Sequence, residues 1–247
     1  MSVPPYFFAA DLGEAPGEVT LAGDEARHAQ AARRLAVGEA VALFDGRGRV
    51  AQGRVEAARR GALVLRIERV SRRPEPRPLV LASALPKGDR LAVLLDMATQ
   101  LGMTRFVPLQ CARSVVRPAA RARERWERIC LEACKQSRRA WLPAVDEPCA
   151  TEQVTQRIGD GVRWWVADPQ GAPVREALVG EESDEAAGRG AGLVVGPEGG
   201  FTGDELERLE AFGVRRLSLG PAILRVEAAA VAGVSALALC AGGGLRR

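Results

Sequence analysis

Histidine is almost absent from this chain of 247 residues, because His28 is the only one. A Ser-His-Asp triad and a zinc site built from several histidines both need imidazole groups, so neither is expected. No cysteine has the C-x-x-C spacing of a zinc or redox site, so we expect free thiols in a reducing cytoplasm and no bound metal. The cysteines are Cys111, Cys130, Cys134, Cys149 and Cys240.

Long apolar segments are also missing. The longest uncharged apolar run, Ala228 to Leu239, is interrupted by Gly233 and Ser235. It is too short to span a bilayer and is typical of a buried helix. The N-terminus, MSVPPYFF, has no basic region followed by an apolar core, so no signal peptide is expected. These absences predict a cytoplasmic protein that has no membrane partner.

Lysine is scarce, since Lys87 and Lys135 are the only lysines among 35 basic residues. Arginine suits recognition of phosphates and base edges, but a GC-rich genome would give the same bias. Local clustering is therefore the better signal. Residues 24–77 contain 13 arginines and 7 acidic residues, and residues 113–139 contain nine basic and three acidic residues. Each patch fits an RNA-binding surface, with an ordinary solvated face as the alternative.

The hydrophobic pattern predicts two domains, at residues 1–72 and 73–247. The first is β-rich and has the several short strands of a small barrel. The segment 71–78, SRRPEPRP, is typical of a stiff, exposed linker. Beyond it, strands and helices alternate, which predicts an α/β domain with a mostly parallel sheet. The predicted strands are 41–44, 50–55, 63–67, 79–84, 106–109, 164–167, 193–195 and 217–219, and the predicted helices are 25–35, 91–101 and 121–138.

The most informative stretch begins at the apolar strand Leu193 to Val195. The strand runs into Gly196-Pro197-Glu198-Gly199-Gly200, which has neither helical nor strand periodicity. Thr202 and Glu205 then form the pattern of a capping box at the start of a helix, and Gly213 is placed to end it.

A second glycine-proline loop, Gly220-Pro221-Ala222, follows the predicted strand 217–219. Open parallel sheets bind ligands beyond the carboxyl ends of their strands, so the two loops predict one binding site. The alternative is that both are only tight connections. Because no Walker loop and no G-x-G-x-x-G occurs, phosphate-bound nucleotides are not indicated. The helix start after Gly200 could still bind an anion, which leaves an enzyme with a phosphoryl ligand as one hypothesis.

The motif GPEGGFT, with LG-P-ILR-V-E-A about twenty residues later, resembles the signature of the small-subunit (16S) ribosomal RNA uridine-N3 methyltransferases of the SPOUT superfamily. The segments 85–90 and 113–139 resemble the same family, and the pattern from His28 to Gly48 resembles its N-terminal domain. The resemblance implies a SPOUT-type α/β methyltransferase domain with a C-terminal trefoil knot. It also implies a preceding PUA-like β-barrel that binds RNA.

The resemblance further implies S-adenosyl-L-methionine as the cofactor, 16S ribosomal RNA of the small subunit as the partner, and a homodimer. It places the cofactor on Gly196, Pro197, Gly199, Leu219, Gly220, Ile223 and Leu224. Glycines allow close backbone approach, and the apolar residues suit an adenine ring. The candidate RNA-binding residues are His28, Arg33, Arg34, Arg113 and Arg139.

Two residues of the loops are candidate catalytic groups. The imide nitrogen of uridine becomes nucleophilic only as its proton leaves, so negative charge builds on the neighbouring carbonyl oxygens. We expect Arg225 to stabilise that charge as a fixed donor. Glu198 is a candidate to accept the proton or to orient the base. The alternatives are a structural ion pair of Arg225 with Glu227 or Glu198, and binding of backbone amides by Glu198.

Four positions of the second predicted domain depart from the family pattern. Met97 and Gln100 stand where the family commonly has lysine and glutamate, and Val226 and Ala228 stand where it commonly has threonines. These changes motivate an alternative function, a catalytically inactive RNA-binding factor for ribosome assembly with the same fold.

Overall fold

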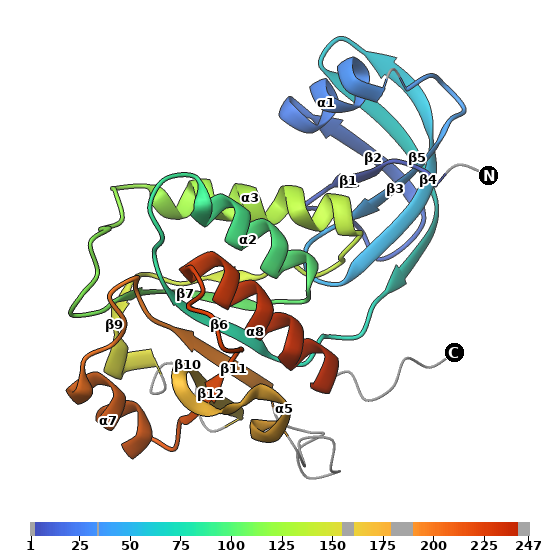
Figure 1. Cartoon of the computed structure of the whole chain (residues 1–247). Coiled ribbons are helices and arrows are strands. Elements are labelled where there is room, and N and C mark those ends of the chain that lie inside the picture. Colours follow the sequence, from blue (N-terminus) through green and yellow to red (C-terminus); the bar gives the residue numbers. More distant parts are fainter. Residues whose placement is uncertain (1–2, 34, 155–160, 179–189, 242–247) are drawn as a thin grey trace. The chain divides into compact units, whose positions relative to one another are not determined.

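Figure 1 shows the computed structural model of the chain, which describes residues 3–33, 35–154, 161–178 and 190–241. For residues 28, 30–33 and 241 it describes the backbone alone. The chain forms two compact units, Met1–Glu75 with Cys134–Leu142, and Pro76–Ala133 with Pro143–Arg247. This division is discontinuous in sequence, and the domain boundary expected at residues 71–78 stays a prediction.

The first unit contains a mixed five-stranded sheet with the strand order β1-β3-β4-β5-β2. β1 is parallel to β3, and the other pairs are antiparallel. The three predicted strands and the predicted helix are confirmed, whereas β1 and β2 were not expected. The elements are β1 (Tyr6–Phe8), β2 (Gly17–Ala22), α1 (Gly23–Arg33), β3 (Ala40–Phe44), β4 (Arg49–Arg59) and β5 (Ala62–Arg72).

Bulges bend the sheet of the first unit into a half-barrel around an apolar core. The register between β4 and β5 shifts at Gln52/Gly53 and again at Val55/Ala57. A Cβ atom on Gly53 would lie 2.3 Å from the carbonyl oxygen of Arg66, so only glycine allows this close approach of the strands. The enclosed side chains include Phe7, Leu43, Leu63 and Leu65, all nearly inaccessible.

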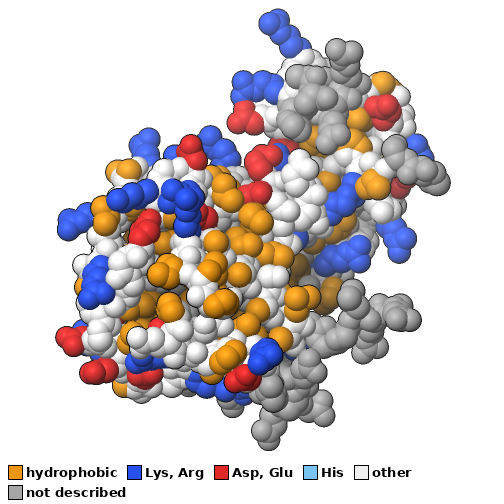
Figure 2. Space-filling model, in the orientation of Figure 1, with side chains coloured by type: hydrophobic (Ala, Val, Ile, Leu, Met, Phe, Trp, Pro, Cys, Tyr) orange, Lys and Arg blue, Asp and Glu red, His pale blue; other side chains and the backbone are white. Residues whose placement is uncertain are grey.

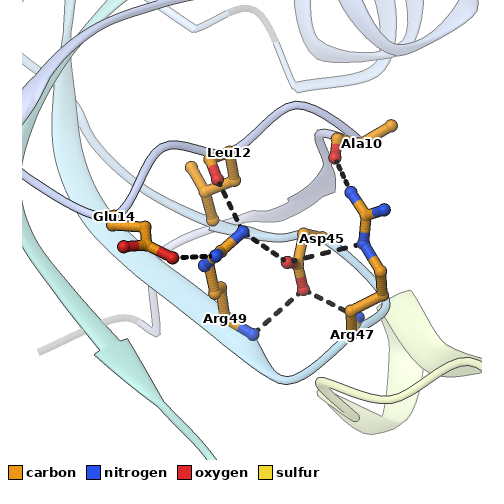
Figure 3. A network of polar contacts seen from close by, with 6 residues as sticks. All are labelled: Ala10, Leu12, Glu14, Asp45, Arg47 and Arg49. Atoms are coloured by element: carbon orange, nitrogen blue, oxygen red, sulfur yellow. Dashed lines mark hydrogen bonds and ion pairs between the residues drawn. The ribbon is translucent and has the colours of Figure 1, made fainter.

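A buried carboxylate organises the turn between β3 and β4 (Figure 3). Asp45 Oδ1 accepts the backbone N–H groups of Arg47 at 2.7 Å and Arg49 at 2.9 Å. Asp45 Oδ2 lies 3.7 Å from the Arg49 guanidinium and 3.9 Å from that of Arg47. The two arginines also donate to the carbonyls of Ala10 and Leu12, which ties the N-terminal segment to this turn.

The same turn holds the segment Cys134–Leu142 in the first unit. The N–H of Gly48 donates to the carbonyl of Ala140 at 3.0 Å, and that of Leu142 donates to Gly46 at 3.0 Å. The Trp141 ring lies directly over Gly48, where an added Cβ atom would be 2.5 Å away.

The second unit contains a seven-stranded parallel sheet in the order β12-β10-β11-β6-β7-β8, with β9 also beside β7. All five strands predicted for this part are confirmed. They and two short additions are β6 (Leu79–Ala84), β7 (Arg105–Gln110), β8 (Ala144–Val145), β9 (Cys149–Ala150), β10 (Val162–Pro173), β11 (Gly190–Val195) and β12 (Arg215–Ser218). The helices are α2 (Arg90–Gln100), α3 (Ala122–Ser137), η1 (Thr151–Gln153), α5 (Val174–Ala177), α7 (Gly203–Ala211) and α8 (Val226–Ala241).

Both faces of this sheet are covered. β6 and β11 are buried along their whole length, as expected of central parallel strands. Alternate residues Leu79 and Leu81 pack with α2, α3 and α8, whereas Val80 and Ala82 pack on the side of α7 (Figure 1). From the edge strand β12 the chain returns to the centre, where α8 packs on β11 and β6. The resemblance places the trefoil knot in this returning segment.

The predicted helices are confirmed. The apolar run 228–239 is helical, as part of α8, but only one face of it is buried: Val234 is inaccessible, whereas Leu239 is 75% exposed. Thr202 caps α7, and Gly213, with a φ angle of 80°, follows its end as expected. None of the described helices is long and apolar enough to cross a membrane.

We predict that Asp45→Asn destabilises the first unit. An amide would place a donor beside two guanidinium groups, so the free energy of unfolding should fall by about 1–3 kcal/mol in urea denaturation. Glu14→Gln is the matched control, because Glu14 pairs with Arg49 at the exposed end of the same network and should cost under about 0.5 kcal/mol. Equal effects of the two variants would contradict the role given to burial.

Candidate active site

Three strand ends open at one edge of the parallel sheet. β10 lies between β11 and β12 and is parallel to both. Val166 pairs with Val194 on one side and with Arg216 on the other, so the three strands end almost level. The segments that follow them therefore converge, although they are far apart in sequence.

A cavity of about 330 Å³ lies at this edge. Its lining comes from residues 167–170 of β10, from 195–198 and 200–201 at and beyond the end of β11, and from 218–220 and 222–224 at and beyond the end of β12, with Leu206, Val226 and Ala229. Of the seven predicted cofactor residues, only Gly199 is outside the lining. The two glycine-proline loops thus share one space, as the sequence predicts.

The first loop is shaped by a close contact between Gly196 and Phe201. A Cβ atom on Gly196 would lie 2.9 Å from the Phe201 ring, so a larger residue would displace that ring from the cavity wall. The N–H of Gly200 donates to the carbonyl of Pro197 at 2.8 Å, which closes a tight turn. Thr202 then starts α7 with the predicted capping box.

Glu205, the second member of the capping box, is buried and makes contacts beyond its own helix. Its Oε2 accepts the N–H of Thr202 at 2.9 Å. Its Oε1 accepts the N–H of Ala112 and the hydroxyl of Thr151, each at 2.9 Å. Burial acts to raise the pKa of this carboxyl, but the hydrogen bonds from Thr202, Ala112 and Thr151 together lower it.

Arg113 lies against the outside of the first loop. Its Nη1 donates to the carbonyl oxygens of Gly199 at 2.9 Å and Phe201 at 3.3 Å. The side chain is otherwise exposed. The contact of Arg113 with RNA stays a prediction. One nitrogen of its guanidinium is already bound to the loop.

The second loop presents apolar side chains to the cavity and then begins a helix. Ile223 is 93% exposed and Leu224 is 40% exposed, although both are apolar. Exposed apolar groups on a cavity wall are suited to contact with a ligand. Val226, which stands where the family commonly has threonine, is the first residue of α8. Its side chain is buried in the apolar core.

Arg225 and Glu198, the predicted catalytic pair, are both exposed at this edge of the sheet. Glu198 lines the cavity, and Arg225 lies between the lining residues Leu224 and Val226. With the described residues Arg225 forms no side-chain hydrogen bond or ion pair. Glu227 lies instead 3.7 Å from the guanidinium of Arg90.

The segment Asp168 to Gln170 belongs to the site but was missed. Ala167 and Ala172 both pair with Leu217, so the four residues between them bulge out of β10, and the first three of them line the cavity. Asp168 accepts the N–H of Gln170 at 2.9 Å and the guanidinium of Arg216 at 3.2 Å. The available signal was the sequence Ala-Asp-Pro-Gln at the end of a predicted strand.

The other candidate RNA-binding residues are separate from this cavity. Arg139 is half-buried in the segment that packs in the first unit. His28 and Arg33 lie in α1, but their side chains, and Arg34 entirely, lie outside the described residues. Within the described ranges no three His, Cys, Asp or Glu side chains gather as a metal site. Burial raises the pKa of the Cys111 thiol to about 11, so this cysteine is not a reactive thiolate.

Comparison with known proteins gives the family. Residues 73–238 match the family described as RNA methyltransferase domain, and residues 21–68 match the RNA methyltransferase PUA domain. The chain is 35% identical over 238 residues to the ribosomal RNA small subunit methyltransferase E of Mycobacterium bovis, covering 94% of this chain and 90% of that protein. It is 33% identical over 234 residues to the same enzyme of Bacillus subtilis, covering 92% and 91%.

Solved structures agree with this assignment. The crystal structure of a ribosomal RNA small subunit methyltransferase E from Neisseria gonorrhoeae, bound to S-adenosyl methionine, superposes with a TM-score of 0.82 at 26% identity. The match covers 95% of this chain and 96% of that one. The expected fold, a PUA-like unit and a SPOUT-type α/β unit, is thereby confirmed. The chain belongs to the ribosomal RNA small subunit methyltransferase E family.

Proposed function

We propose that this protein is an S-adenosylmethionine-dependent methyltransferase that modifies N3 of a uridine in 16S ribosomal RNA. The observation that carries the proposal is the convergence of the two glycine-proline loops on one cavity. Relatives over most of the chain are named as small subunit ribosomal RNA methyltransferases, and one related structure is bound to S-adenosyl methionine. A cytoplasmic location accompanies this substrate as a prediction.

The cavity suits a positively charged, partly apolar ligand. Its lining includes the carboxylates of Asp168 and Glu198 but no lysine or arginine. A phosphoryl ligand would meet no basic side chain in this lining, because the guanidinium of Arg216 is already bound to Asp168, which disfavours that hypothesis. Leu219, Ile223 and Leu224 offer apolar contact to a base ring. The residues present therefore fit the methyl donor.

When bound, S-adenosylmethionine supplies an electrophilic methyl group on a sulfonium sulfur. Arg225 stabilises the negative charge that builds on the uracil carbonyl oxygens as the N3 proton leaves. Glu198, on the opposite loop, accepts that proton or orients the base. No reaction step requires a metal, because the attack occurs at carbon.

The RNA is held by arginine-rich surfaces. Neutralising phosphates supplies much of the affinity of any RNA-binding protein, and both units are locally rich in arginine. We assign this role to the residues predicted from the sequence, His28, Arg33, Arg34, Arg113 and Arg139. The match to an RNA methyltransferase PUA domain supports the contribution of the first unit.

We further propose a homodimer that forms through α2 and α8. These helices pack on each other and leave apolar side chains exposed: Val93 is 49%, Met97 43% and Leu239 75% exposed. Ala228 and Ala232, also exposed, continue the uncharged face of α8. Figure 2 shows hydrophobic side chains gathered over these two helices. A second copy is the occupant that this uncharged face fits, and the departures Met97 and Ala228 lie on it.

The cofactor assignment predicts micromolar binding of S-adenosylmethionine in calorimetry, competed by S-adenosylhomocysteine and not by ATP. Gly196→Val should weaken that binding at least roughly tenfold, because its side chain would displace Phe201. Gly203→Val is the matched control, since an added Cβ there meets nothing within 4 Å. Absence of heat with the unaltered protein would refute the proposal, and competition by ATP alone would favour a phosphoryl ligand.

The catalytic assignment predicts that Arg225→Ala retains cofactor affinity and lowers kcat roughly 100-fold or more. The assay is methyl transfer to 30S subunits that lack the modification, followed by mapping of the methylated nucleotide. Arg208→Ala is the control, because it removes an exposed arginine of α7 that pairs only loosely with Glu152. Near-normal turnover by Arg225→Ala would exclude the role given to this residue.

The dimer assignment predicts a mass of about twice the 26.3 kDa of one chain in light scattering coupled to size exclusion. Met97→Asp combined with Leu239→Asp should give monomers, because the interface would bury unpaired charges. Val37→Asp, at a position 65% exposed in the first unit, should leave the mass unchanged. A monomeric unaltered protein would contradict the assignment.

A further inference from the structure

The Glu205 carboxylate makes more contacts than a helix cap requires. A capping box needs only its Oε2, which accepts the N–H of Thr202 at 2.9 Å and the Thr202 hydroxyl at 3.1 Å. Its Oε1 accepts donors from Ala112 and Thr151, which lie 93 and 54 residues away in sequence. The residue is only 8% exposed. One carboxylate therefore joins three separate segments.

The contact with Ala112 bears directly on the next residue, Arg113. Once the backbone of Ala112 is fixed, the Arg113 side chain extends from it to the carbonyls of Gly199 and Phe201. Phe201 lines the cavity and lies against Gly196. A chain of contacts thus leads from Glu205, through Arg113, to the wall of the cavity.

We infer that Glu205 is a positioning residue, which holds Arg113 on the first loop and thereby sets the affinity for the methyl donor. The inference rests on the proposed function, because it concerns the same cavity. Glu205 itself does not line the cavity, so it acts through Arg113 and the loop. It is ionised there, because every group that contacts its oxygens is a hydrogen-bond donor.

The matched substitutions are Glu205→Gln and Glu207→Gln. Both remove one negative charge from α7, but Glu207 is exposed. In Glu205→Gln the new amide group faces donors, so the link to Ala112 or to Thr202 is lost. We expect binding of S-adenosylmethionine to weaken on the order of tenfold in calorimetry for Glu205→Gln and less than about twofold for Glu207→Gln.

A cycle with Arg113→Ala separates positioning from general destabilisation. If Glu205 acts through Arg113, the variant with both Glu205→Gln and Arg113→Ala binds S-adenosylmethionine no more weakly than the single variant with the lower affinity. If Glu205 has a purely structural role, the fold losses in affinity of the two single variants multiply. Thr151→Val removes one hydrogen bond to Glu205 Oε1 and leaves the cap of α7 intact. It should weaken binding of S-adenosylmethionine less than Glu205→Gln does, and it provides a test even if Glu205→Gln does not fold.

The outcomes distinguish this inference from the proposed function. If the unaltered protein and Glu205→Gln bind the methyl donor equally well, the inference fails and the proposed function stands. Where Glu205→Gln does not fold, equal binding by Thr151→Val has the same meaning. Multiplied losses in the cycle also overturn the inference. If the unaltered protein shows no binding, the proposed function and the inference both fail. The inference is supported if Glu205→Gln binds S-adenosylmethionine more weakly, Glu207→Gln binds it as the unaltered protein does, and the losses in the cycle do not multiply.

Discussion

The parallel pairing of β10 with both β11 and β12 is the constraint on which the site depends. Val166 pairs with a residue of each neighbour, so three strands end level and their following segments have to share one space. No single motif creates the cavity. The loops contribute by leaving it open, as Gly196 does where a side chain would strike Phe201. Glu205 and Arg113 then keep one loop in place from behind.

Charge is divided in a way that matches two substrates of opposite sign. The cavity lining has the carboxylates of Asp168 and Glu198 and no basic side chain. The basic residues, 35 in the whole chain, supply the other charge. Under the proposed function, the donor is a cation and the acceptor is a polyanion. Arginine-rich segments then attract the RNA, while a lining without lysine or arginine does not repel the cationic donor.

Local signals in the sequence predicted most of the second unit, and contacts between distant segments account for what was missed. The apolar run of β11 and the capping box of Thr202 depend on neighbouring residues, and both are confirmed. The bulge at Asp168 forms because β10 has four more residues than β12 between paired positions. This difference depends on the pairing of the two strands and cannot be read from the sequence of either strand alone. Likewise, the partners of Glu205 Oε1 are 54 and 93 residues away. The packing of Cys134–Leu142 in the first unit had no local pattern at all.

Under the proposed function, the place of Arg225 follows from the chemistry of the reaction rather than from folding. It immediately precedes α8, where the helix dipole favours an anion and disfavours a cation by about 0.3–1 kcal/mol. Arg216, by contrast, is bound to both Glu210 and Asp168. Among the described residues Arg225 has no such acceptor, although Glu227 follows two residues later. A guanidinium that is to stabilise charge on an incoming base has to remain free of a carboxylate. The folded chain keeps Arg225 exposed and unneutralised beside the cavity, at some expense of stability.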